Sequence, residues 1–314
     1  MLNYVIRRVL YSIPVLLIAS FLLFAFVRST FDPTARLRAS RDKTAVTRER
    51  NRLGLDKPLV SQYGTWLGKA VRGDLGQSTR SGEEVSSMLT RSMGNTLQLI
   101  VWGTILSAIV AVAIGVYSAV RQYTAADYAF TGLSYIGVAM PPFWFGLIAI
   151  ELLAVKSHVF YSLGLHSGDS TGLGMNYVRH LVLPVATLCV QIVASWSRFE
   201  RASMLDVLGA DYVRTARAKG VPQRTVIMKH ALRNALIPLV TVMSLDIGAL
   251  FGGLIITEQI FSIGGMGRLF FNALLSGDVY VLEAWMVIVA AFIIGFNLLA
   301  DVLYGVLDPR IRLA

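Results

Sequence analysis

Six apolar segments recur along this sequence, each close to the length needed to cross a lipid bilayer. They cover residues 9–27, 92–120, 128–150, 180–197, 234–257 and 284–300. A helix of about 20 apolar residues spans the hydrocarbon core of a membrane. Helices also satisfy their own backbone hydrogen bonds where no water is present. The pattern therefore predicts an all-α integral membrane protein with six transmembrane helices.

The composition agrees with this fold class. Of the 314 residues, 55% are hydrophobic and only 15% are charged. The mean hydropathy of +0.60 exceeds what a soluble domain of this size needs to fill one core. The chain holds a single cysteine, Cys189, so it forms no disulfide within itself. A small packing residue in the fourth apolar segment is the expected role of that cysteine.

Basic residues indicate how the helices are oriented, because cytoplasmic segments of membrane proteins are enriched in Lys and Arg. With the N-terminus inside, the inner segments hold eight Lys or Arg between 198 and 233, together with Arg7, Arg8, Arg121, Arg310 and Arg312. The short outer loops hold only Lys156, Arg179 and Arg268. Both termini are therefore expected in the cytoplasm. The net charge of +10 is explained by this topology in a lipid bilayer, without a nucleic acid partner.

Three regions are expected along the chain. Residues 1–30 form an N-terminal segment and the first transmembrane helix, an uncleaved signal anchor because no small-x-small cleavage site follows it. Residues 31–95 are too long for a connector and too polar to insert, so they form a small external cap. Within the cap, RDKTAVTRERNRLG predicts a charged helix that ends at Gly54. Residues 96–314 form a core of five helices with a cytoplasmic loop at about 198–235.

The cytoplasmic loop contains RTARAKGVPQR at 214–224, which is basic and has no acidic residue. The stretch ADYVRTARAK is compatible with a helix, and Gly220 can end that helix because glycine adopts the left-handed conformation. Pro222 suits the first turn of a second helix. The sequence therefore predicts a helix, a tight bend and another helix.

Both predicted helices are amphipathic. Their apolar sides are formed by Tyr212, Val213 and Ala216 in the first helix and by Val226, Ile227 and Ala231 in the second. Basic residues lie elsewhere around each axis, among them Lys229 and Arg233. Such helices can lie against lipid headgroups, and they also suit a docking element for a cytoplasmic protein. The residues alone leave both interpretations open.

The segment GADYVRTARAKGVPQRTVIMKHALRNALIP resembles the EAA loop of permease subunits of ABC importers, in the form typical of the dipeptide, oligopeptide and nickel branch. Gly220 matches the glycine of the pattern EAAxxxG and Ala216 its second alanine, whereas Arg214 and Thr215 replace its Glu and first Ala. Three further segments resemble the B-type subunit of that branch, which has a long first external loop: YVIRRVLYSIPVLLIASFLLFAFVR, RLGLDKPLVSQYGTWLGKAVRGDLGQS and GGLIITEQIFSIGGMGRL. Only FDPT, after the first apolar segment, departs from the branch.

The resemblance implies a type I ABC importer permease fold, with a small external region between the first two transmembrane helices. The chain would form half of a translocation pathway for dipeptides or short oligopeptides in the cytoplasmic membrane of a prokaryote, and it would be no enzyme. Its partners would be a second homologous permease, two cytoplasmic ATPase subunits and an extracytoplasmic substrate-binding protein. Import of nickel or haem by the same machinery is an alternative, as is an ATP-independent carrier or channel.

The resemblance also implies which residues couple the chain to the ATPases: Asp211, Arg214, Ala216, Arg217, Lys219 and Gly220. The sequence has no GxxxxGK[ST] loop that could cradle the phosphates of ATP. We therefore expect no cofactor in this chain, and ATP and Mg²⁺ belong to the partner ATPases. No metal site is expected either, because His158 and His166 in an outer loop have no neighbouring cysteines.

Acidic residues within or beside the apolar segments are candidates for the translocation path. Asp246 lies about ten residues into the fifth segment, roughly at mid-membrane, where an ionisable group faces a cavity or a partner. It either lines the path, or makes an interhelical hydrogen bond, or is a protonated acid. Glu258 lies near the outer boundary, with a packing role as the alternative. Gly248 and Gly252 form GxxxG, which allows close helix packing.

Overall fold

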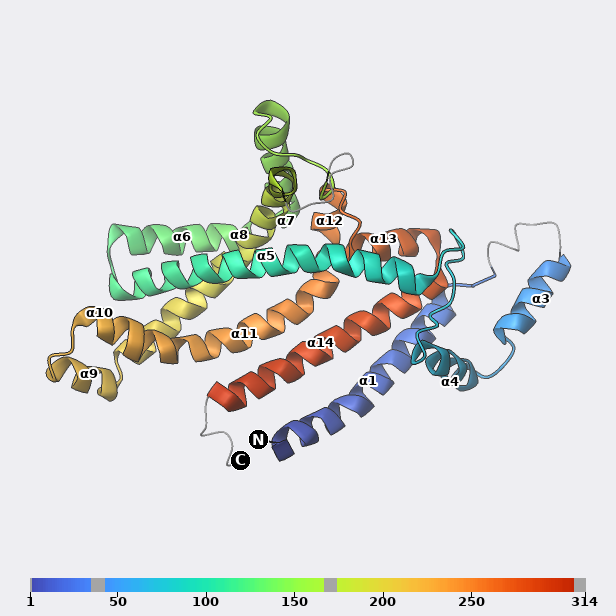
Figure 1. Ribbon diagram of the computed structural model, residues 1–314, viewed down its shortest axis with the longest axis horizontal. Helices are drawn as coiled ribbons and strands as arrows, with labels where there is room; N and C mark the ends of the chain where they lie inside the picture. The colour runs from blue at the N-terminus through green and yellow to red at the C-terminus, as the bar shows by residue number, and fades with distance from the viewer. Residues whose placement is uncertain (1, 35–42, 167–173, 308–314) are drawn as a thin grey trace.

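The computed structural model describes residues 2–34, 43–166 and 174–307. These residues form an elongated helical bundle (Figure 1), and within them the only β-type pairing is one isolated bridge between Gln77 and Glu84. In chain order the elements are α1 (Leu2–Thr30), α3 (Lys43–Leu53), α4 (Leu59–Ala70), α5 (Val85–Val120), α6 (Ala125–Ala139), α7 (Pro142–Ala149), η1 (Ile150–Lys156), α8 (Met175–Leu208), α9 (Asp211–Ala218), α10 (Gln223–Thr225), η2 (Val226–Ala231), α11 (Leu232–Gly253), α12 (Ile255–Ile260), α13 (Met266–Ser276) and α14 (Val279–Leu307). The elements η1 and η2 are π-helical.

Five stretches of the described chain are long and apolar enough to cross a membrane as single helices. They are Ile6–Thr30, Val85–Val120, Met175–Leu208, Gln223–Gly252 and Val279–Leu303. A sixth crossing is reached when α6 and the α7–η1 segment are counted as one broken span. The described chain thus has the all-α membrane architecture that the sequence predicts.

The third apolar segment, expected as one helix over 128–150, is instead bent by 101° between α6 and α7. Pro141 and Pro142 lie at the break. A proline has no N–H to donate and disfavours the helical conformation of the preceding residue, so α6 ends before this pair. The α7–η1 segment projects away from the other long helices in Figure 1.

The helices α5 and α6 both pack closely against α8, because each has a glycine at the point of contact. Gly115 of α5 lies so near Glu200 of α8 that a Cβ atom there would come within 2.6 Å of the glutamate Cβ. In the same way, Gly137 of α6 faces Ala194 of α8, at 2.9 Å from such a Cβ. Close backbone approach of this kind is how helices associate in lipid, where the hydrophobic effect does not drive them together.

The helices α1 and α14 run antiparallel and are joined by an ion pair at each end. Arg8 donates to Asp301 at 2.5 Å at one end. At the other end Arg28 donates to Glu283, with the second of its two bonds at 3.2 Å, and both side chains are buried. The start of α1 and the end of α14 therefore lie at the same end of the bundle (Figure 1).

The described part of the external region contains the short helices α3 and α4. Its charged helix, α3, ends at Leu53 and is followed by Gly54 at φ +62°, as the sequence predicts. The next helix, α4, packs its Tyr63 and Trp66 rings against Phe24 of α1. Within the region expected over 31–95, α5 begins at Val85, so its first turns belong to that range.

Candidate functional site

The segment from α9 to α10 has the helix, bend and helix that the sequence predicts. Gly220 has φ +76°, a left-handed conformation that costs a residue with a Cβ atom free energy. Its N–H donates to the Arg217 carbonyl at 2.9 Å, and the N–H of Val221 donates to the Ala216 carbonyl at 3.2 Å. This pair of bonds is the Schellman motif, which satisfies carbonyls left open at a helix end. Pro222 then precedes the first residue of α10.

A small apolar cluster holds the bend together. Val213 and Ala216 of α9 are buried against Val226 of η2, and Val221 packs beside them. Tyr212 was expected on the same apolar face, but its side chain is 47% exposed. Its hydroxyl instead accepts a hydrogen bond from the Asn234 side chain at 3.1 Å. The tyrosine therefore ties the outer side of α9 to α11 through a polar contact.

The other side of α9 carries exposed charges. The Asp211 and Arg214 side chains are 97% and 70% exposed and lie 3.5 Å apart. An ion pair with this exposure contributes little to stability, because water screens it. Arg217 and Lys219 are likewise exposed. The polar face of α9 therefore remains available for contact with another molecule.

The helices that flank this segment extend beyond the apolar segments at 180–197 and 234–257. The loop was expected over about 198–235, yet α8 continues to Leu208 and the next membrane-crossing stretch begins at Gln223. Only a short segment lies between two long helices of the core. A displacement of α9 would therefore act directly on the ends of α8 and α11.

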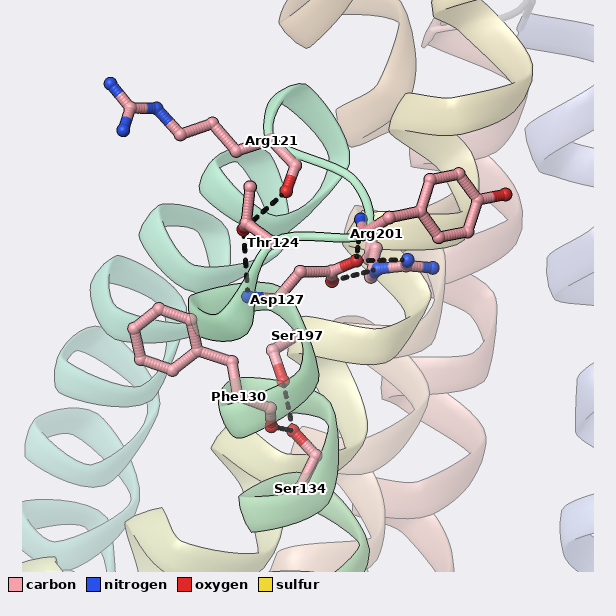
Figure 2. A network of polar contacts seen from close by, with 8 residues as sticks. Arg121, Thr124, Asp127, Phe130, Ser134, Ser197 and Arg201 are labelled. Carbon is pink, nitrogen blue, oxygen red and sulfur yellow. Dashed lines mark hydrogen bonds and ion pairs between the residues drawn. The ribbon is translucent and has the colours of Figure 1, made fainter.

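A polar network joins α6 to α8 near the same end of the bundle (Figure 2). Asp127, buried on α6, accepts hydrogen bonds from Arg201 of α8 at 2.8 Å and 2.9 Å and from the Tyr123 N–H at 3.0 Å. Two turns along, the hydroxyls of Ser134 and Ser197 lie 3.2 Å apart. The α5–α6 turn is thereby attached to the helix that leads into α9.

Asp127 and Arg201 were not identified from the sequence. The pattern TAAD at 124–127 precedes an apolar run, and the spacing is that of a helix N-terminal capping box. Thr124 does cap α6, because its hydroxyl accepts a hydrogen bond from the Asp127 N–H at 3.3 Å. This local pattern could have located Asp127, but nothing local could have paired it with a residue 74 positions away.

The two acids proposed for the translocation path have separate surroundings. Asp246 of α11 accepts a hydrogen bond from the indole N–H of Trp196 on α8, with Trp196 Nε1 and Asp246 Oδ2 2.7 Å apart. The side chain of Asp246 is partly buried. The interhelical hydrogen bond that the sequence left open is present, and the role of Asp246 in the path stays a prediction.

Glu258 of α12 is fully buried and has polar partners on two other elements. It accepts from the Thr96 hydroxyl of α5 at 2.6 Å and from the Arg268 N–H of α13 at 2.9 Å. Burial raises the pKa of the Glu258 carboxyl, although these hydrogen bonds oppose the shift. A Cβ atom on Gly265 would fall 2.3 Å from the carboxylate. Glu258 therefore joins three elements, while its role in the path stays a prediction.

Gly248 and Gly252 face α14 of the same chain. A Cβ atom on Gly248 would lie 2.8 Å from Cβ of Phe296, and one on Gly252 would lie 3.2 Å from Cγ1 of Val289. Real Cβ atoms do not approach other atoms as closely as the first of these distances. The absence of a side chain therefore lets α11 and α14 pack together at this point.

The arrangement defines a polytopic helical membrane protein with a short polar segment at one end of its core helices. Residues 111–313 match the family described as "Binding-protein-dependent transport system inner membrane component". Residues 1–113 match the N-terminal family described as "Binding-prot-dependent transport system membrane comp, N-term". The chain belongs to this family of transport system membrane components.

Relatives of known designation extend over the full length of the chain. The oligopeptide transport system permease protein AppB of Bacillus subtilis is 40% identical over 99% of this chain and 100% of its own length. The corresponding figures for the oligopeptide transport system permease protein OppB of Mycobacterium tuberculosis are 36%, 100% and 100%. For the glutathione transport system permease protein GsiC of Escherichia coli they are 38%, 99% and 99%.

A solved structure shares the fold. It is an inward-facing conformation of the MetNI methionine ABC transporter, with a TM-score of 0.57 and 17% sequence identity over 70% of this chain and 96% of that chain. At this identity the likeness establishes the fold alone. Family and relatives together make the chain a membrane-spanning permease subunit of a binding-protein-dependent transport system, a transport component and not an enzyme.

Proposed function

We propose that this chain forms one half of the translocation pathway of an ATP-driven importer of dipeptides or short oligopeptides. The names of its relatives support a peptide substrate, since they include oligopeptide and glutathione transport systems. A cytoplasmic membrane of a prokaryote is the proposed location, with both termini in the cytoplasm. The start of α1 and the end of α14 lie at the same end of the bundle, which agrees with an even number of membrane crossings.

The observation that carries the coupling part of this proposal is the α9–α10 segment. It is held in one shape by the turn at Gly220 and by the cluster around Val213, and its exposed charges, including Arg217, point away from that cluster. A rigid segment between two core helices transmits movement, whereas a flexible loop would absorb it. We propose that α9 docks on an ATPase subunit through Asp211, Arg214, Arg217 and Lys219.

The remaining partners follow from this arrangement. A second, homologous permease would complete the pathway, and two ATPase subunits would hold ATP and Mg²⁺ on the side of α9. A substrate-binding protein would dock at the opposite end, where α3, α4 and α13 lie (Figure 1). ATP binding and hydrolysis would shift the equilibrium between inward-facing and outward-facing forms by making different contacts with α9 in each.

The path itself would pass the core helices at the level of Asp246. A carboxylate at mid-membrane favours a cationic group such as the ammonium of a peptide, because an unpaired charge there is costly. Its hydrogen bond from Trp196 would orient the carboxylate without neutralising it. Replacement of Asp246 by Asn keeps the hydrogen-bonding shape and removes the charge, so transport of peptides with and without a free ammonium tests this role.

The test of the proposal is ATP hydrolysis by the reconstituted complex of this chain, its sister permease, the ATPases and a loaded binding protein. We expect a peptide-loaded binding protein to stimulate ATP hydrolysis. Stimulation by nickel or haem instead would make that ligand the proposed substrate in place of peptides. We expect Arg217→Gln to lower that stimulation. Arg7→Gln is the matched control, because Arg7 is an exposed arginine on α1 outside the coupling segment. Transport without any ATPase would overturn the importer proposal in favour of a carrier or channel.

A further inference from the structure

An apolar groove of about 380 Å³ lies between the end of α5 and the stretch formed by α10, η2 and the start of α11. Its lining comes from two stretches of chain that are far apart in the sequence: Val112, Ala113, Val116, Tyr117, Val120 and Arg121 on one side and Arg224, Ile227, Met228 and Leu232 on the other. The side chain of Met228 is 55% exposed and that of Tyr117 is 40% exposed. The groove is therefore open at the surface of the chain and is not part of the core.

The only charged groups along the described lining of this groove are two arginines. Arg121 follows the last residue of α5, and Arg224 lies in α10, the first turn of the next membrane-crossing stretch. Both positions are helix ends at the boundary of candidate spans. The groove thus has apolar walls along the spans and positive charge at the level where the spans end.

Neither arginine is neutralised by an acid among the described residues. Arg121 lies over the Tyr117 ring, with 5.6 Å between the guanidinium carbon and the ring centroid. Figure 2 shows its side chain extending away from the Asp127 carboxylate, which is occupied by Arg201. Arg224 is exposed and has no ion pair in the described part of the chain. Two exposed cations that line the same groove favour an anion as its occupant.

We propose that this groove binds one anionic phospholipid, with the phosphate between Arg121 and Arg224 and an acyl chain along the apolar walls. Charge complementarity favours an anionic over a zwitterionic lipid, since basic pockets between transmembrane helices bind acidic headgroups. The walls favour a lipid over a free phosphate ion, because an ion would leave them uncovered. The groove lies between two candidate membrane spans, so a lipid would enter it from the bilayer.

The bound lipid would have a structural consequence for the neighbouring segment. It would bridge α5 to α10, and Val226 beside this wall is part of the cluster that holds α9 in place. The lipid would thus fix the position of the α9–α10 segment relative to α5. The proposal holds for any imported substrate, and its failure would leave the transport assignment unchanged.

The experiment measures lipid retention by the purified full-length chain in detergent, using native mass spectrometry. Phosphatidylglycerol and phosphatidylcholine with the same acyl chains are the two probes. We expect one phosphatidylglycerol to be retained in preference to phosphatidylcholine. Arg121→Gln and Arg224→Gln should each weaken that retention about fivefold, which corresponds to the loss of one basic contact with an anionic lipid.

Two further variants separate the groove from general charge effects. Arg72→Gln removes one exposed positive charge from the external region and should leave retention unchanged. Ala113→Trp fills the groove from an exposed position and should abolish the retained lipid without altering the core. In the last arm, inorganic phosphate is added as a competitor for the two arginines, and the lipid should remain bound.

Four outcomes would overturn the proposal. Equal retention of the two lipids would show that charge does not select the occupant. Retention of phosphatidylglycerol by Ala113→Trp would place the lipid elsewhere on the chain. An equal loss in Arg72→Gln would indicate non-specific electrostatics. Displacement by inorganic phosphate alone would show that the arginines form an ion site and that the apolar walls play no part.

Discussion

The turn at Gly220 offers the sharpest test of how the coupling segment works. At φ +76° an alanine would occupy a conformation that costs an L-residue about 1–2 kcal/mol. A Cβ atom there meets nothing within 4 Å, so the cost comes from the backbone alone. Gly220→Ala should therefore destabilise the turn by about 1 kcal/mol, since reduced freedom of the unfolded chain offsets part of the strain. Opening of the turn should become about fivefold more frequent.

A second glycine provides a matched control. Gly73, after α4, has φ +86° and also has nothing within 4 Å of an added Cβ. Its hydrogen bonds repeat those at Gly220, because Gly73 N–H donates to the Ala70 carbonyl at 2.9 Å and Asp74 N–H donates to the Lys69 carbonyl at 3.1 Å. Gly73→Ala introduces the same strain in the external region.

The assay compares binding-protein-stimulated ATP hydrolysis and peptide uptake by the reconstituted complex with the thermal stability of each variant. We expect both alanine variants to lose similar stability and only Gly220→Ala to lose uptake per ATP hydrolysed. Gly220→Val should lose more, because a β-branched residue tolerates the left-handed conformation poorly. Wild-type coupling in Gly220→Ala and Gly220→Val, or an equal loss of coupling in Gly73→Ala, would refute the idea that this turn transmits force.

Three further predictions concern the helix contacts. Glu283→Gln should destabilise the chain by about 3–5 kcal/mol because it leaves the buried Arg28 charge unpaired. Thermal unfolding measures the loss of stability. The double variant Arg28→Leu with Glu283→Leu removes both charges and should recover part of that loss. Gly248→Ala should lower the free energy of unfolding by about 1–3 kcal/mol, because it forces α11 away from Phe296. Gly295→Ala is the control and should not destabilise the chain, because an added Cβ there has nothing within 4 Å. Equal Tm values for the two variants would contradict this prediction. Burial raises the pKa of Glu258 above its ordinary 4.5, so the stability that the protonated carboxyl provides is complete below pH 4.5 and is lost as the pH rises through the folded-state pKa. As the pH rises from 4.5 through that pKa, the Tm of Glu258→Gln should therefore decline less than the Tm of the unmodified chain. Identical slopes of Tm against pH in the two proteins would argue against this prediction.

Features that depend on a short stretch of chain could be predicted from the sequence. The apolar segments predict the crossings, because the transfer of a helix into lipid depends on its own side chains. The bend after α9 was predicted because Gly220 and Pro222 restrict the backbone locally. The end of α3 at Gly54 has the same local cause.

Helix boundaries were predicted less well. The apolar segments stop where charges begin, yet α8 continues from Ser197 to Leu208 and α5 begins at Val85, before its apolar segment. A helix does not end at the membrane surface, because its backbone hydrogen bonds continue in water. The break at Pro141 had a local signal, but the 101° angle between α6 and α7 depends on what each half packs against.

The positions of the apolar membrane segments and the shape of the bend after α9 were thus predicted from the sequence alone. Only the tertiary structure decided which side chains meet: Asp127 pairs with Arg201 across 74 positions, and Arg28 with Glu283 across 255. The same holds for the groove between α5 and η2, whose two walls come from separate crossings. The physical reason is range, since backbone preferences and lipid transfer act within one helix, whereas ion pairs and grooves require the packing of several helices at once.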